Sequence, residues 1–235
     1  MFRILTTQWR FLRATPCFFM SSHLPSFKSV PEVIKYTKEN TDHLTAKEVF
    51  SLFDTLFTLK HQCDLRKNDD VMIFFKDDKL KKFIKSLSPS EQIKVVKRLS
   101  QMEIKDSKEW NRVFRLVTER VKDMTSSELY KLMKHALELT GKKTDKESWR
   151  LLMKEIGKRI DEYDVKTVIG VVKTAVKLNF DKKNFWKNVN KKVLSHLQEY
   201  DKEQLKELVD NYMKLDPPQE ETVKKMDNEL IKKSR

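Results

Sequence analysis

Five short segments of the chain share one pattern of hydrophobic and polar positions. In each, a large apolar residue precedes Thr, Ser or Asp, and in four of the five a Glu or Gln follows three residues after that. The segments are residues 44–48, 87–91, 124–128, 163–167 and 200–204. This is the pattern of a capping box with its staple residue, in which side chains satisfy the free amide groups of a new helix. The sequence therefore predicts five helix starts, separated by 43, 37, 39 and 37 residues.

An amphipathic helix pattern follows each predicted start. In the third unit the apolar positions are three and four residues apart, at Leu129, Leu132, Met133, Ala136 and Leu139. This spacing predicts a helix with one face in a core. The second unit fits less well, because Gln92 occupies the first apolar position.

Three tryptophans mark a second helix in the middle units. Trp110, Trp149 and Trp186 lie 23, 25 and 23 residues after the starts of their units, and an apolar face continues from each. Because they lie on the apolar side, we interpret them as packing residues between hairpins. Base stacking is the alternative role for aromatic side chains in such a frame.

These repeated units predict an all-α fold, a short α-solenoid of about five helical hairpins. Only three glycines and six prolines occur, which disfavours β-hairpins and glycine-rich phosphate loops. We expect the array to span residues 31–216, with an insertion at residues 63–78 in the first unit. After Pro217 and Pro218, residues 217–235 form a polar helix that we expect to cap the C-terminal end of the array.

Residues 1–30 have the composition of a mitochondrial transit peptide followed by a disordered lead. The opening segment contains Arg3, Arg10 and Arg13, and the first carboxylate of the chain is Glu32. Arginine-containing, acid-free amphipathic segments are typical of mitochondrial presequences. A secretory signal is disfavoured because Arg10 and Arg13 interrupt every apolar stretch, and an ordinary N-terminal helix is the third reading. We expect cleavage between Ala14 and Ser29 and residence in the mitochondrial matrix.

The hairpin frame resembles the heptatricopeptide repeat. The resemblance lies in the start pattern, the apolar first helix and the Phe or Trp that opens the second helix, and it is clearest over residues 163–215 within a match of about residues 44–216. Such repeats occur in mitochondrial FAST-kinase-like and RAP-domain proteins and in organellar proteins of protists. The resemblance implies RNA binding, RNA maturation or a place in the mitochondrial ribosome. No RAP domain follows the repeats in this sequence, so RNA cleavage is not implied.

The formal net charge of +14 indicates attraction to a polyanion, either RNA or an anionic membrane surface. No stretch approaches the 18 apolar residues needed to cross a bilayer. Counting from each tryptophan places basic residues at matching positions of successive second helices, where stacked helices would align them along a phosphate backbone. The predicted RNA-binding residues are Arg115, Arg120, Arg150, Lys154, Lys158, Arg159, Lys187 and Lys191. The alternative is a solvated lysine-rich surface with no specific partner.

The sequence contains no recognisable catalytic or metal-binding motif. His61 and Cys63 are two residues apart, but no second pair of ligands accompanies them to complete a tetrahedral metal site. Phosphate loops, nucleophile elbows and dinucleotide fingerprints are absent from the sequence. Removal of the leader would leave Cys63 as a single thiol, which fits a reducing compartment. We therefore expect no enzyme activity, no cofactor and no metal.

The leading hypothesis from the sequence is a mitochondrial RNA-associated helical-repeat protein that acts by binding, either as a constituent of the mitoribosome or as an RNA processing or stability factor. Its expected partners are mitochondrial rRNA or mRNA and the proteins of a ribonucleoprotein complex. The alternative is a structural accessory subunit of a mitochondrial complex that binds protein and not RNA.

Overall fold

The computed structural model describes residues 24–40, 43–59, 61, 78–101, 108–139, 145–215 and 219–234. Every regular element in these ranges is helical. The α-helices are α1 (Val30–Asn40), α2 (Ala46–Thr58), α4 (Asp78–Ser86), α5 (Pro89–Gln101), α6 (Lys108–Thr118), α7 (Ser126–Leu139), α8 (Lys146–Lys158), α9 (Val165–Lys177), α10 (Lys183–Ser195), α11 (Lys202–Tyr212) and α12 (Glu220–Lys232). Residues 1–23 of the expected leader (1–30) and residues 63–77 of the expected insertion (63–78) lie outside the described residues.

All five predicted helix starts are confirmed by the hydrogen bonds of their caps. At the start of α2, the Thr45 hydroxyl accepts from the Glu48 amide at 3.3 Å, and the Glu48 carboxylate accepts from the Thr45 amide at 2.7 Å. The same reciprocal pairs form at α5, α7 and α11. At α9, where no Glu or Gln follows, the Asp164 carboxylate accepts from the Thr167 amide at 2.7 Å. Local side-chain chemistry therefore sets where each unit begins.

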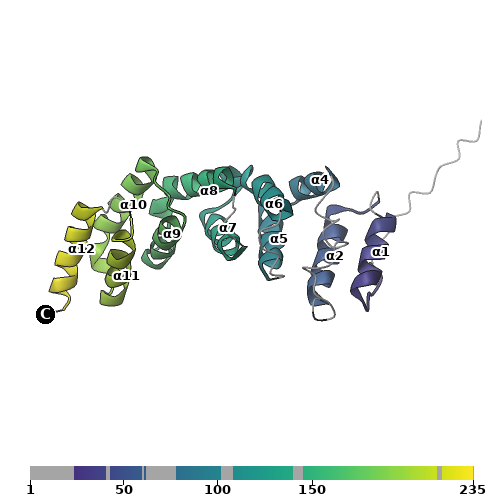
Figure 1. Ribbon diagram of the computed structural model, residues 1–235, viewed down its shortest axis with the longest axis horizontal. Coiled ribbons are helices and arrows are strands. Elements are labelled where there is room, and N and C mark those ends of the chain that lie inside the picture. Colours follow the sequence, from purple (N-terminus) through teal and green to yellow (C-terminus); the bar gives the residue numbers. More distant parts are fainter. Residues whose placement is uncertain are drawn as a thin grey trace, which may run out of the picture.

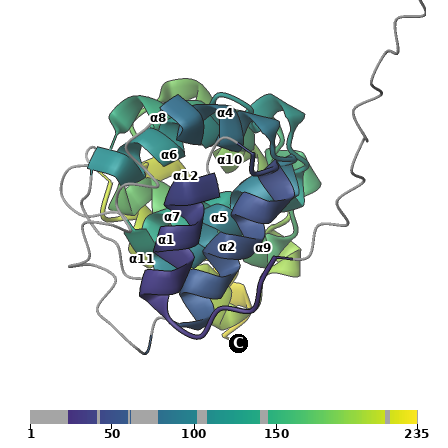
Figure 2. The same ribbon diagram turned by 90° about the vertical axis from the view of Figure 1, so that its right-hand side faces the viewer.

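The helices form two layers, which confirms the all-α solenoid. The first-helix layer consists of α2, α5, α7, α9 and α11, and the second-helix layer consists of α4, α6, α8, α10 and α12. Each helix packs against the next helix of its own layer. Figure 1 shows the resulting elongated array, in which the helices follow one another in chain order along the long axis. Figure 2, which looks along the array from the α1 end, shows α4, α6 and α8 above α1, α2 and α5.

The N-terminal end of the array is closed by α1, a helix that the repeat pattern does not single out. It packs against α2 and buries Val30, Val33 and Ile34. The segment before it also contributes, because the Phe27 ring packs edge-on against Tyr36 at 5.3 Å between ring centroids. The described residues before α1 thus add to the packing at this end of the array.

The predicted packing role of the three tryptophans is confirmed by their burial. Trp110, Trp149 and Trp186 are each at most 4% exposed. The Trp149 ring contacts Phe114 of the preceding hairpin at 5.1 Å between centroids, and the Trp186 ring contacts Tyr212 of the following hairpin at 5.5 Å. These side chains therefore lie in the contacts through which one hairpin stabilises the next.

Two departures from the sequence pattern have a structural reason. Gln92 is fully buried at an apolar position because its side-chain amide donates to the Ile84 carbonyl at the end of α4 at 2.7 Å. The last helix, α12, packs against both α10 and α11 and buries Val223 and Met226. It is therefore the second helix of the fifth hairpin as well as the last helix of the array.

Candidate nucleic-acid interface

The predicted row of Arg115, Lys154 and Lys191 lies on the outer side of the second-helix layer. All three side chains are exposed, and their helices α6, α8 and α10 are successive neighbours in the layer. Each lies five residues after a buried tryptophan, a separation of about 500° around a helix with 3.6 residues per turn. That rotation turns the side chain away from the core, so the repeat frame correctly places these cations in solvent. We call these three residues the second-layer row.

Three further predicted residues lie beside this row, and two of them are paired with carboxylates. Lys187 is exposed and, like the second-layer row, has no carboxylate partner among the described residues. Arg150 forms a two-pronged pair with Glu147 one turn earlier, and this hydrogen bonding lowers the pKa of Glu147. The ammonium group of Lys158 lies 3.0 Å from the Glu155 carboxylate. Arg150 and Lys158 thus contribute less net charge to the surface than their sequence positions suggest.

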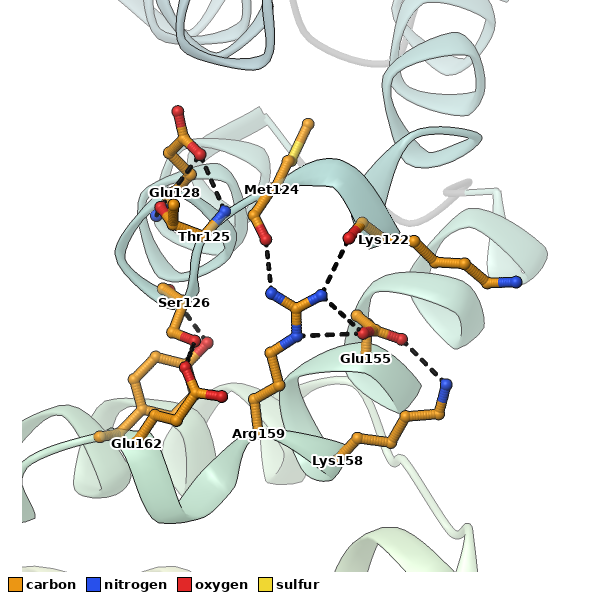
Figure 3. Close-up of polar contacts among 10 residues, drawn as sticks. Lys122, Met124, Thr125, Ser126, Glu128, Glu155, Lys158, Arg159 and Glu162 are labelled. Carbon is orange, nitrogen blue, oxygen red and sulfur yellow. Dashed lines mark hydrogen bonds and ion pairs between the residues drawn. The ribbon is translucent and has the colours of Figure 1, made fainter.

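Arg159 points back into the array instead of outward (Figure 3). Its guanidinium group donates to the Met124 carbonyl, to the Lys122 carbonyl at 3.0 Å, and to one Glu155 oxygen at 2.9 and 3.1 Å. Burial alone would raise the pKa of Glu155, but the hydrogen bonds from Lys158 and Arg159 outweigh it, so the pKa is lowered. The guanidinium group of Arg159 therefore binds the start of its own hairpin at Met124 and the end of the preceding hairpin at Lys122.

Arg120 makes the equivalent contacts one hairpin earlier. Its guanidinium donates to the Leu87 carbonyl at 2.7 Å and lies 3.4 Å from the Lys85 carbonyl and from the Asp123 carboxylate. Leu87 occupies the same place in its unit as Met124 does in the next. Two of the eight predicted interface residues thus join the end of a hairpin to its beginning.

In the last two hairpins a lysine binds the equivalent carbonyl from a different position in the repeat, and His196 occupies the position of Arg120 and Arg159 in the fourth hairpin. The ammonium group of buried Lys192 donates to the Asp161 carbonyl at 3.1 Å, and that of Lys233 donates to the Gln198 carbonyl at 3.0 Å. The acceptors of successive units are Lys85, Lys122, Asp161 and Gln198, which are 37, 39 and 37 residues apart. Helix ends leave carbonyls without intrahelical partners, and a cation there satisfies them and the negative end of the helix dipole. We call Arg120, Arg159, Lys192 and Lys233 the hairpin-closing cations.

The first-helix layer carries a row of lysines that counting from the tryptophans does not reveal. Lys97, Lys134 and Lys173 each lie nine residues after the cap residue of their helix, and all three are exposed. Their helices α5, α7 and α9 are successive neighbours. Counting from the cap residue would have found them, because the caps provide a second repeat frame. We call these three residues the first-layer row.

The described residues offer little else for chemistry. Within them, no group of three or more His, Cys, Asp and Glu side chains is arranged to hold a metal ion. None of the described helices is both long and apolar enough to cross a membrane. No protein-family model matches the chain, and no curated protein matches it significantly. The geometry of the array and its charge are therefore the features of the molecule that bear on its function.

Proposed function

We propose that this protein is an RNA-associated helical-repeat protein of the mitochondrial matrix, acting by binding as a mitoribosome constituent or as an RNA processing or stability factor. The observation that supports this most directly is the alignment of exposed cations in three successive hairpins, on both layers of the array. Regularly spaced cations on a rigid support suit a phosphate backbone, whose charges are also regularly spaced. The resemblance to heptatricopeptide repeats points in the same direction and is part of this proposal.

The test is the salt dependence of RNA binding by the full chain. A fluorescent oligouridylate should bind, and the logarithm of its affinity should fall linearly with the logarithm of salt concentration, by about 0.7 per phosphate contact. If no salt-sensitive binding is measurable near physiological ionic strength, RNA is not the partner. A protein-binding accessory subunit would then be the better description.

One observation favours that second function. Met213, directly after α11, and Ile231 of α12 are 57% and 54% exposed. Large apolar side chains at the open end of a solenoid are suited to contact with another protein. Sedimentation of the native protein with and without ribonuclease treatment distinguishes the two functions. An RNA-dependent assembly dissociates on treatment, so the protein sediments more slowly, whereas an assembly with protein alone is unchanged.

The proposed compartment has its own test. Leu24 and Phe27 pack against the buried core, so a mature chain beginning before Leu24 keeps these contacts. We expect cleavage in the part of the 14–29 window that precedes Leu24. N-terminal sequencing of protein recovered from mitochondria measures this directly. A mitochondrial form that still begins at Met1 or Phe2 contradicts the transit peptide.

A further inference from the structure

The outward face of the first-helix layer is strongly basic over three hairpins. The exposed lysines of α5, α7 and α9 are Lys94, Lys97, Lys131, Lys134, Lys166, Lys173 and Lys177. The acidic residues of these helices are Glu91 and Glu128, both bound in caps, and Glu138, which lies 3.6 Å from His135. Helix α9 contains no acidic residue. We call the seven lysines the first-layer strip.

Partly exposed aromatic rings accompany this strip. Phe50, Phe57 and Tyr130 are half-buried, the Lys94 ammonium lies 5.9 Å from the centre of the Phe50 ring, and the Arg98 guanidinium lies 4.3 Å from that of Phe57. In the second-helix layer, by contrast, every aromatic ring of α6, α8 and α10 is buried: Trp110, Phe114, Trp149, Phe185 and Trp186. Among the described helices of the central hairpins, α5 to α10, a half-buried aromatic ring thus occurs at Tyr130 of α7, in the first-helix layer. The neighbouring first-layer helix α2 adds Phe50 and Phe57, whereas α4 at the same end of the second layer has half-buried Phe83.

The strip ends at α11, where carboxylates replace the lysines at the corresponding helix positions although Lys202 and Lys206 are also exposed. The exposed residues of α11 at the corresponding positions are Glu203, Glu207 and Asp210. Glu207 pairs with Lys173 across the two helices at 3.0 Å, so it lowers the charge of the strip at that end. At the other end Asp54 of α2 pairs with Arg98 at 2.6 Å. A polyanion that follows this face is attracted over α5, α7 and α9 and repelled at α11.

We propose that single-stranded RNA lies along the first-layer strip, with phosphates against Lys97, Lys134 and Lys173 and bases against Phe50 and Tyr130. Proteins that bind single strands combine a basic path with aromatic rings on which bases stack. The second-layer row supplies charge alone, which suits less specific attraction. This inference rests on the proposed function and assigns it to one face of the array.

Two matched triple variants test the assignment. The substitutions are Lys97→Gln, Lys134→Gln and Lys173→Gln in the first-layer row, and Arg115→Gln, Lys154→Gln and Lys191→Gln in the second-layer row. Each set removes three positive charges from exposed positions, so net charge changes equally. The probe is a fluorescent oligouridylate of on the order of ten nucleotides, a length within the usual site sizes of single-strand binders. Circular dichroism of each variant checks that helix content is retained.

The first-layer triple should weaken binding by on the order of tenfold to a hundredfold near 0.1 M salt, and the salt slope should shrink by roughly 2. The second-layer triple should weaken binding several-fold less. Equal losses, or a larger loss in the second-layer triple, overturn the assignment to the first layer. If the wild-type chain does not bind the oligouridylate at all, the proposed function itself is wrong, and the result is then distinct from a wrong assignment to the first layer.

A gain of affinity provides a test that cannot result from misfolding. Neutralising the acidic end through Glu203→Gln, Glu207→Gln and Asp210→Gln should raise affinity for the same probe, because repulsion is removed and Lys173 loses its carboxylate partner. The matched control is Glu199→Gln, Glu220→Gln and Glu221→Gln, three exposed carboxylates near the same end of the array but outside α11. Equal gains in both variants overturn the proposed path. Displacement of the RNA by polyglutamate at equal charge concentration would assign the strip to an acidic protein segment instead.

Discussion

Lys154 and Arg159 lie five residues apart at the end of α8 and carry the same charge, but their surroundings differ. The Lys154 side chain extends into solvent, whereas the Arg159 guanidinium lies among two backbone carbonyls and the buried Glu155 carboxylate. The same difference separates Arg115 from Arg120 one hairpin earlier. A basic residue of this array is thus available to a partner where neither a backbone carbonyl nor a carboxylate of the array binds it.

The largest loss of stability is expected from a substitution on the buried side of α8, at Trp149. Trp149 is 3% exposed and contacts Phe114 of the neighbouring hairpin. Trp149→Ala removes a large buried side chain and leaves a cavity, so we expect a loss of roughly 3–5 kcal/mol in the free energy of unfolding. Denaturant melts measure the loss. A change below about 1 kcal/mol would show that Trp149 does not couple the hairpins.

One pair of substitutions tests whether Arg159 contributes more to stability than Lys154. Arg159→Gln removes donors from the Met124 and Lys122 carbonyls and leaves Glu155 with Lys158 alone, so we expect a loss of about 1–3 kcal/mol. Lys154→Gln removes an equal charge from solvent, and its effect should stay within about 0.5 kcal/mol. Thermal or denaturant unfolding of the two variants is the measurement. Similar losses in both would mean that the contacts of Arg159 contribute nothing beyond its charge.

Helix starts and buried faces were predictable because both depend on residues close together in the sequence. A cap joins residues three apart, as in Thr45 and Glu48, and an apolar face repeats every three or four residues. The burial of the three tryptophans was predictable because each lies on the apolar face of its own helix. The repeat pattern does not single out α1, which lacks it. It predicts a second helix in the first unit but not the bounds of α4, because α4 follows the insertion and has no tryptophan to mark it.

The function of the hairpin-closing cations was not predictable in this way. Arg120 and Arg159 bind carbonyls 33 to 37 residues earlier in the chain, and a backbone carbonyl has no signature in the sequence. The available signal was weaker: both arginines lie at a helix end, shortly before the next cap, where a cation near free carbonyls is favourable. The first-layer row does not align in a frame that starts at the tryptophans, because Lys97, Lys134 and Lys173 repeat with the cap residues of their own helices.

Acid should weaken the hairpin ends and the caps more than the outward rows. Hydrogen bonds from Thr45 and Ser88 lower the pKa of Glu48 and of Glu91, and the pKa of Glu155 is also lowered. A carboxylate with a lowered folded-state pKa stabilises the fold above its ordinary pKa of about 4.3, and this contribution is lost as the pH falls through the folded-state value. We therefore expect the free energy of unfolding to decline as the pH drops below about 4.3.

Glu155→Gln tests how much of this acid sensitivity comes from Glu155. The variant has one ionisable group fewer at a hairpin end, so the difference in unfolding free energy between neutral and acid pH should be smaller than in the wild type. Urea melts at several pH values measure both differences. Equal acid sensitivity in the two proteins would show that the ion pairs of Glu155 do not contribute to stability.

The smallest expected effect concerns a helix end that is closed without any cation. After α9 the Phe180 amide donates to the Ala175 carbonyl at 2.9 Å and the Leu178 amide donates to the Thr174 carbonyl at 3.0 Å. Asn179, with φ of 49°, makes this turn possible, because Asn tolerates the left-handed conformation better than most residues. Asn179→Ala should cost about 1 kcal/mol, and Asn179→Gly should change stability by less than about 0.5 kcal/mol, since glycine reaches this conformation freely but loses more entropy on folding. Denaturant melts of the two variants provide the measurement. A loss in Asn179→Ala as large as that in Arg159→Gln would mean that backbone geometry at the end of α9 and the cation at the end of α8 contribute equally to stability.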